Sequence, residues 1–119
     1  MNNQKVLETV VKAADERRAN DIVVLNIEDL SVMGRYFVVM DASSERQVKA
    51  IANNIEDHLE EDGVKIIHFE GKDKSNWILM DLGDVIVHVF KTETREFYNL
   101  EKLWADAKAV DVSNWITED

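Results

Sequence analysis

The sequence predicts an α/β domain with a five-stranded mixed β-sheet and flanking helices, in the order α-β-β-α-β-β-β-α. Apolar residues recur at helical spacing in residues 3–19 and again after Ser44, which indicates two amphipathic helices. Short β-branched or aromatic runs lie between and after them, and turn-forming residues 81–84 join the last two runs. Because the chain has 119 residues and no Pro- or Gly-rich linker, we expect a single domain over residues 1–107.

The chain before Ser44 is expected to form one helix and two antiparallel strands. The buried stripe of the helix follows the i, i+3, i+4, i+7 pattern at Val6, Leu7, Val10, Val11 and Ala14. Asn20 suits the left-handed position that often follows a helix. Residues 22–27 and 36–40 are predicted strands, and their short connection without a helix favours antiparallel pairing.

The second helix is the most clearly marked element of the sequence. Ser44-Glu45-Arg46-Gln47 fits the S-x-x-Q capping box, in which the hydroxyl and the amide pair with backbone N–H groups at the helix start. Gly63 is expected to end this helix. Its buried face consists of Val48, Ile51, Ala52, Ile55 and Leu59. Residues 65–69 then predict a third strand.

The next two strands, residues 77–80 and 85–90, are predicted to form a hairpin with two different faces. A turn centred on Leu82 and Gly83 pairs Trp77 with His88. One face is then aliphatic and should pack on the helices: Ile78, Met80, Val85, Val87 and Val89. The other face is mixed: Trp77, Leu79, Ile86, His88 and Phe90. Since a covered imidazole needs a polar neighbour, we expect this face to meet an external partner or a helix of this chain.

After the hairpin, the sequence predicts a short helical or irregular segment and then a tail. Apolar residues recur at helix-like spacing at Phe97, Leu100, Leu103 and Trp104, and three of them, Phe97, Leu103 and Trp104, suit the core. Residues 108–119 are expected to form an acidic, partly disordered C-terminal tail. Docking points within this tail are offered by Val110, Val112, Trp115 and Ile116.

Composition and charge narrow the classes of function. The chain has no cysteine, which excludes disulfides and thiolate metal sites. Residues 1–18 lack the apolar core of a signal peptide and no apolar run is long enough for a membrane span, so we expect a cytoplasmic protein. The formal net charge is −10, from 24 acids and 14 bases, and no basic patch is visible. Direct DNA binding is therefore disfavoured, as is direct RNA contact, and basic protein surfaces are favoured.

Three groups of residues contain side chains that occur in catalytic sites. In each group, however, the surrounding sequence favours a structural role. Asp81 and Asp84 flank a turn, where paired carboxylates can bind Mg²⁺, but aspartate is also a common turn residue. His88 has no serine or cysteine placed beside it as a nucleophile. Asp41-Ala42-Ser43-Ser44 resembles the triphosphate-binding turn of nucleotidyltransferases, but it lacks their glycine, and no Asp-x-Asp motif follows. The residues therefore predict a nucleotidyltransferase-like fold without its chemistry, and no cofactor.

Several motifs together resemble the ribosomal silencing factor family, RsfS, also called Iojap. They are SERQVKAIA at 44–52, Trp77, Asp81, GDVIVHVF at 83–90 and REFYNLEKLW at 95–104. The strands DIVVL at 21–25 and YFVV at 36–39 fit as well. The resemblance covers about residues 4–107, with Ala42-Ser43 in place of a common glycine-containing pair.

The resemblance implies a non-catalytic protein with a nucleotidyltransferase-like fold. Members of the family bind the large ribosomal subunit through its ribosomal protein L-fourteen, at the face that meets the small subunit. They thereby block subunit joining and lower translation when nutrients are scarce. Two alternatives stay open: a metal-dependent nucleotidyl- or phosphotransferase that uses Asp81 and Asp84, and a homodimer in which a second copy covers the open sheet face.

The residue patterns and the resemblance converge on one expected partner-binding surface near the hairpin. Its aromatic and aliphatic anchors are Trp77, Leu79, Leu82, His88, Phe90, Tyr98 and Leu100. Its acidic rim, which would pair with a basic ribosomal protein, consists of Asp81, Asp84, Glu93 and Glu96. Packing within the chain is the alternative role for each anchor.

Overall fold

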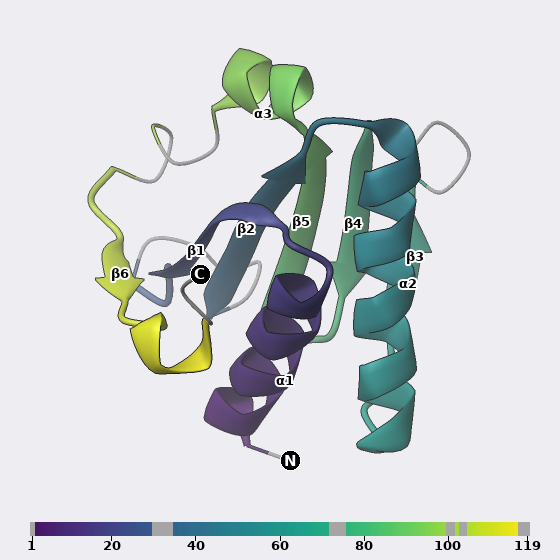
Figure 1. Cartoon of the computed structure of the whole chain (residues 1–119). Coiled ribbons are helices and arrows are strands. Elements are labelled where there is room, and N and C mark those ends of the chain that lie inside the picture. Colours follow the sequence, from purple (N-terminus) through teal and green to yellow (C-terminus); the bar gives the residue numbers. More distant parts are fainter. Residues whose placement is uncertain (1, 30–34, 72–75, 100–101, 103–104, 117–119) are drawn as a thin grey trace.

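A computed structural model of the chain describes residues 2–29, 35–71, 76–99, 102 and 105–116 (Figure 1). The described helices are α1 (Asn3–Glu16), α2 (Glu45–Glu61) and α3 (Thr92–Tyr98), with a 3₁₀ turn η1 (Ser113–Trp115). The strands are β1 (Asn20–Asn26), β2 (Tyr36–Ala42), β3 (His68–Glu70), β4 (Trp77–Asp81), β5 (Val85–Lys91) and β6 (Lys108–Val110). None of these helices is long and apolar enough to cross a membrane.

The strands form one mixed sheet in the order β3-β4-β5-β2-β1-β6. The predicted α/β class and the antiparallel pairing of β1 with β2 are confirmed. At the centre of the sheet, β2 and β5 are parallel, because the chain between them crosses over through α2 and the β3–β4 pair. Figure 1 shows α1 and α2 together on one face of the sheet, with α3 at the end where β2 and β5 finish.

The predicted number of five strands is wrong, because the described residues already form a sheet of six. The sixth strand, β6, lies in the segment that the sequence assigned to an acidic tail, and it pairs with β1 through Leu25 and Ala109. Just after β6, Val112 is buried in the core, and Trp115 and Ile116 pack against it. A strand of three residues is too short to show an alternating pattern, so its sequence gave no sign of it.

The hairpin of β4 and β5 differs in register from the prediction by two residues. Trp77 pairs with Phe90, rather than with His88, because the turn is centred on Gly83 and Asp84. At this turn Gly83 has φ +99°, and the Leu82 N–H donates to the Val85 carbonyl at 2.9 Å. An even shift leaves every side chain on its predicted face. The division of the hairpin into two faces is therefore confirmed.

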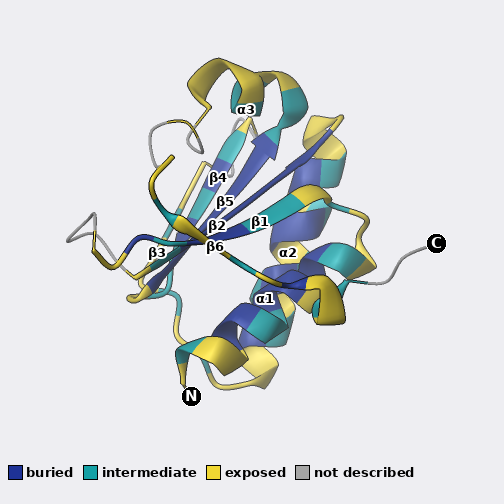
Figure 2. Cartoon of the chain, turned by 90° about the vertical axis from the view of Figure 1, so that its left-hand side faces the viewer, coloured by how far each residue is buried: buried dark blue, intermediate teal, exposed yellow. Residues whose placement is uncertain are grey.

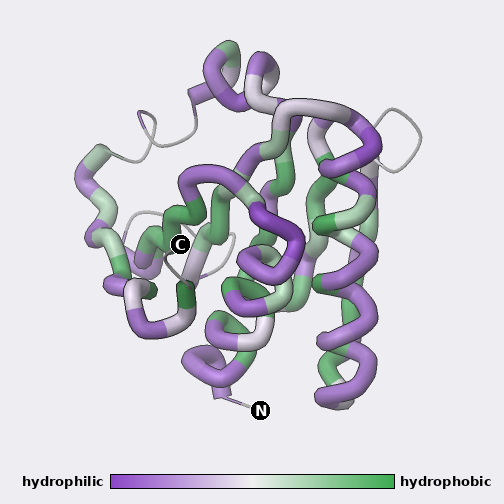
Figure 3. The backbone as a smooth tube through the Cα atoms, in the orientation of Figure 1, coloured by the Kyte–Doolittle hydropathy of each residue, from purple (hydrophilic) through white to green (hydrophobic). Residues whose placement is uncertain are grey.

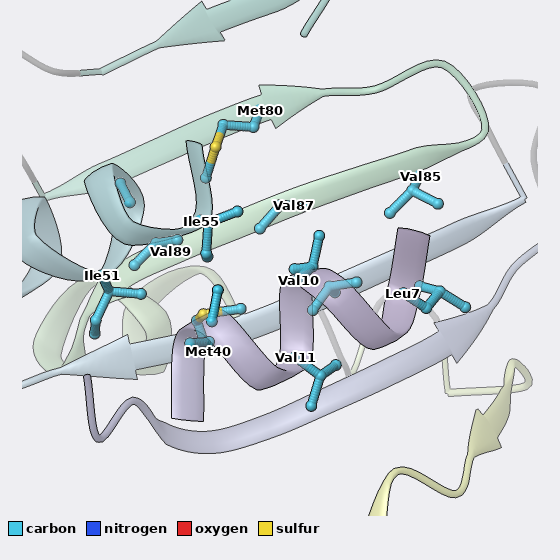
Figure 4. Packing of buried hydrophobic residues seen from close by; sticks show 14 of the residues in the cluster. Leu7, Val10, Val11, Met40, Ile51, Ile55, Met80, Val85, Val87 and Val89 are labelled. Carbon is cyan, nitrogen blue, oxygen red and sulfur yellow. The ribbon is translucent and has the colours of Figure 1, made fainter. Parts of the chain in front are cut away.

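Two apolar clusters occupy the two faces of the sheet. The larger lies between the sheet and the helices, where Val10 and Ile55 meet Met80 and Val87 (Figure 4). The dark blue buried positions in Figure 2 follow the strands and the inner sides of α1 and α2, and Figure 3 shows hydrophilic residues on the outer sides. The smaller cluster lies on the opposite face: Leu25, Ile27, Phe37, Val39, Ile86 and Phe90. Both faces of the central strands are thus buried.

Several element boundaries differ from the prediction, most clearly those of α1, β1 and β3. Helix α1 ends at Glu16, because the Arg17 and Ala19 N–H groups both donate to the Ala14 carbonyl and close the helix. The left-handed residue after it is Arg18, with φ 59°, and not Asn20, which begins β1. The third strand begins at His68, three residues later than predicted.

The capping box at the start of α2 is half confirmed. Ser44 Oγ accepts a hydrogen bond from the Gln47 N–H at 3.2 Å, as predicted. The Gln47 side chain, however, donates to the Arg17 carbonyl at 3.3 Å and so caps the end of α1 instead. The box motif thus joins two helices that are adjacent in space but distant in sequence.

We expect Ser44→Ala to lower the free energy of unfolding by about 1 kcal/mol, because one backbone N–H of α2 loses its acceptor. Urea denaturation followed by circular dichroism measures this change. Ser43→Ala, at an exposed neighbouring position, is the control and should unfold like the wild type. Equal stability of all three proteins would contradict a capping role for Ser44.

Candidate partner-binding surface

The structure separates the predicted partner-binding residues by exposure. Asp84, Glu96 and Tyr98 are exposed. Four more are half-buried on β4 and its turn: Trp77, Leu79, Asp81 and Leu82. His88 and Phe90 are buried, and Leu100 lies outside the described residues. The expectation of an open strand face is therefore wrong for His88 and Phe90, because both side chains are buried in this structure.

An aromatic group links the sheet to α3. The centroid of the Trp77 ring lies 4.9 Å from that of the Phe90 ring and 4.9 Å from that of the Tyr98 ring. Tyr98 in turn contacts Phe97 edge to face at 5.1 Å. The series of rings therefore runs from the buried core at Phe90 to the solvent at Phe97.

Phe97 was predicted to lie in the core, but 81% of its surface is exposed. Helix α3 has only 7 residues, buries none of them, and ends at Tyr98, after which Asn99 is left-handed with φ 46°. Leu103 and Trp104, which were predicted to lie in the core as well, are outside the described residues. Phe97 instead lines a shallow groove of about 330 Å³, which we call the aromatic groove. The groove is lined by Asn76, Trp77, Glu93, Thr94, Phe97 and Tyr98.

His88 holds the Trp77 indole in place from inside. The Trp77 Nε1–H donates to His88 Nδ1 at 3.0 Å, so the neutral imidazole carries its proton on Nε2. His88 Nε2 is buried and has no hydrogen-bond partner among the described residues. Burial lowers the pKa of His88 to about 4, which keeps the ring neutral near pH 7. His88 therefore orients Trp77 and is not placed to act as a surface base.

Helix α3 is fixed by a polar network and not by a buried apolar face. None of its residues is buried, and its start has no side-chain cap. Arg95 forms an ion pair at 3.0 Å with the carboxylate of Asp41, which is only 4% exposed. Thr92 Oγ1 donates to the same carboxylate at 3.1 Å, and Arg95 also donates to the Asp21 carbonyl at 2.8 Å. This network determines where Phe97 and Tyr98 lie.

Sequence reasoning did not identify Asp41 and Arg95 as a pair. They lie on β2 and α3, and neither belongs to a periodic pattern that would place them together. An open cleft of about 840 Å³ lies beside them, between β1 and α3. Because Asp41 and Arg95 are directed at each other, they neutralise each other's charge at this cleft.

Asp81 and Asp84, the carboxylates of the metal-dependent alternative, are engaged by neighbouring groups. Asp81 Oδ1 accepts a hydrogen bond from the Gly83 N–H at 2.8 Å, the usual role of aspartate in a turn. Asp84 Oδ2 accepts one from the Asn3 side chain at 3.3 Å, which joins the hairpin to the start of α1. Among the described residues, no group of three or more His, Cys, Asp or Glu side chains is arranged to hold a metal ion.

Comparison with known proteins gives consistent relatives over nearly the full chain. A ribosomal silencing factor RsfS of Bacillus subtilis is 44% identical over 112 residues, which cover 94% of this chain and 95% of that protein. A crystal structure of a protein from Bacillus halodurans is 40% identical, covers 92% of this chain and 100% of its own, and superposes with a TM-score of 0.82. A mouse protein named mitochondrial assembly of ribosomal large subunit protein 1 is 31% identical over 101 residues, which are 82% of this chain and 44% of that protein.

The family match agrees with these relatives. Residues 1–119, the whole sequence, match the family described as "Ribosomal silencing factor during starvation". This match includes the segment 108–119, which lay beyond the motifs on which the sequence resemblance rests. The chain therefore belongs to the ribosomal silencing factor (RsfS) family.

Proposed function

We propose that this protein binds the large ribosomal subunit in the cytoplasm through ribosomal protein L-fourteen and sterically blocks association with the small subunit. The result is repression of translation when nutrients are limited. The family description, which names silencing and starvation, supports this role, as does the mouse relative named for assembly of the large subunit. The description names a regulatory factor and not an enzyme, so the proposed mechanism involves no catalysis and no cofactor. We also propose that the fold is nucleotidyltransferase-like.

The single observation that best supports a binding role is the exposed aromatic groove. Three large hydrophobic residues are exposed among the described ones, and two of them, Phe97 and Tyr98, are adjacent on α3 beside Trp77. Aromatic residues that combine partial burial with exposure are typical anchors of protein interfaces. The contact residues that we propose are therefore Trp77 and Tyr98, with Leu79 on the same face of β4 as Trp77 and Leu82 at the hairpin turn.

The charge of the protein suits a basic partner. The formal net charge is −10. Exposed carboxylates lie at the hairpin turn (Asp84), in the aromatic groove (Glu93) and at the cleft beside Arg95 (Glu96). Opposite charges on two proteins accelerate their encounter and fix their relative orientation. We infer that the acidic rim guides the protein to a basic ribosomal protein, while the rings supply most of the affinity.

Steric exclusion requires only that the bound protein occupies volume needed by the small subunit. Inhibition then depends on the fraction of large subunits that carry the protein. One protein per large subunit should suffice, and silencing should be stoichiometric, with no turnover.

We expect Trp77→Ala and Tyr98→Ala each to weaken binding to purified large subunits by roughly 30-fold, the loss typical of a truncated aromatic anchor. Binding can be measured by sedimentation through a sucrose gradient at several protein concentrations. Circular dichroism should show that both variants remain folded, because each ring is partly exposed.

Lys49→Ala is the matched control, because Lys49 is exposed on α2, on the other face of the sheet. This variant should bind like the wild type. Wild-type binding by both aromatic variants would refute the proposed surface.

A further inference from the structure

We propose that the aromatic groove receives a lysine or arginine side chain of the protein partner, held by the faces of Trp77, Phe97 and Tyr98 and by the Glu93 carboxylate. This inference rests on the proposed function, since it concerns the same surface. It adds to that function the chemical identity of the partner side chain that enters the aromatic groove.

Three aromatic rings, those of Trp77, Phe97 and Tyr98, line one small volume. The Tyr98 ring is inclined by 48° to Trp77 and by 83° to Phe97, with centroid distances of 4.9 and 5.1 Å. Rings set at such angles form adjacent walls rather than a flat stack. The negative face of an aromatic ring attracts a cation that lies within about 6 Å of its centre. A groove of about 330 Å³ is large enough for one long side chain.

The charges at the groove favour a cation over an apolar or anionic group. Of its six lining residues, Glu93 is acidic and none is basic. Arg95, the basic residue of α3 nearest in sequence, is directed instead at Asp41. An apolar group would remove Glu93 from water without pairing it, and an anion would be repelled by it. A lysine or arginine side chain satisfies both the rings and the carboxylate.

The walls of the groove are fixed before a partner arrives. Trp77 is held by its hydrogen bond to His88, and α3 is held by the ion pair of Arg95 with Asp41. Preorganised walls avoid the entropy cost of ordering side chains on binding. The positions of the rings in the free protein are therefore those that the cationic side chain meets.

A peptide titration tests the chemistry without the ribosome. The full chain is titrated to millimolar concentration with a glycine-flanked arginine peptide, a lysine peptide, and their neutral counterparts containing citrulline and acetyl-lysine. The Trp77 indole N–H resonance reports binding by NMR, after assignment with a Trp77→Phe variant. We expect a shift with the cationic peptides that is absent with the neutral ones, and lost in Glu93→Gln. Equal shifts with cationic and neutral peptides, or no shift with either, would overturn the inference.

A second measurement separates this inference from the proposed function. We expect Glu93→Gln and Phe97→Leu each to weaken binding to purified large subunits roughly 5- to 30-fold, while Phe97→Tyr retains binding. Glu60→Gln, the same charge change at an exposed position of α2, is the control and should have no effect. Wild-type binding by Glu93→Gln and Phe97→Leu would overturn the inference and leave the proposed function standing. If the wild-type protein binds the cationic peptides but does not bind large subunits, the inference is supported and the proposed function is refuted.

Discussion

Replacing Arg95 with methionine is expected to lower the free energy of unfolding by about 3–5 kcal/mol, because it leaves the Asp41 carboxylate buried without its cation. Only 11% of the Arg95 side chain and 6% of the Asp41 side chain are accessible to water, so solvent cannot replace the lost partner. Helix α3 buries no apolar residue that would hold it in place after the change. The loss should be visible as a lower midpoint in urea denaturation.

The double variant Asp41→Leu with Arg95→Met separates the cost of a buried unpaired charge from the loss of packing. Because it removes both charges, its stability should recover most of the way to the wild type. Arg46→Met, an exposed change on α2, is the control for the substitution itself. Wild-type stability of Arg95→Met, or a double variant no more stable than the single one, would show that the ion pair does not fix α3.

Lowering the pH from about 7 to about 4 should cost the wild type about 3 kcal/mol more stability than it costs a His88→Gln variant. Burial lowers the pKa of His88 from 6.5 to about 4 in the folded protein, while the unfolded chain keeps the ordinary value. Between these two values the unfolded state takes up a proton that the folded state does not. The contribution of His88 is therefore fully present above pH 6.5 and is lost as the pH falls toward 4.

Urea denaturation at several pH values measures this difference. The carboxylates and the other two histidines, His58 and His68, are present in both proteins, so their contributions cancel in the comparison. Protonation of Nδ1 also removes the acceptor for the Trp77 indole, and a change in tryptophan fluorescence should accompany the loss of stability. Parallel curves of stability against pH for the two proteins would contradict a buried, neutral His88.

Periodicity in the sequence was sufficient to predict the helices α1 and α2 and the two faces of the hairpin. The two helices are long, and apolar residues alternate along the hairpin strands. An error of a few residues in the ends of these elements does not change which apolar residues face the core. The hairpin register was not predictable to this accuracy, because both Leu82-Gly83 and Gly83-Asp84 can occupy a tight turn. Because the register differs by an even number of residues, every side chain of the hairpin stays on its predicted face of the sheet. The prediction of which residues share a face was therefore unaffected.

The candidate site was less predictable, because its positions depend on contacts between distant segments. The mixed face of the hairpin was identified correctly, but its burial depends on Phe37 and Leu25 of neighbouring strands, which a sequence pattern does not place. Phe97 was assigned to the core because its spacing continued toward Leu100. In the structure α3 ends at Tyr98, and the ion pair that holds this helix joins residues 54 positions apart. Local patterns carry no information about such a pair.

The central claim is that this protein acts by occupying the large ribosomal subunit, and co-sedimentation tests it most directly. The protein is mixed with purified large subunits or, as control, with purified small subunits, and each mixture is spun through a sucrose gradient. The account predicts one protein per large subunit, none on the small subunit, and fewer joined ribosomes when both subunits are present. Absence of the protein from the large-subunit fraction, or undiminished subunit joining when it is bound, would contradict the account.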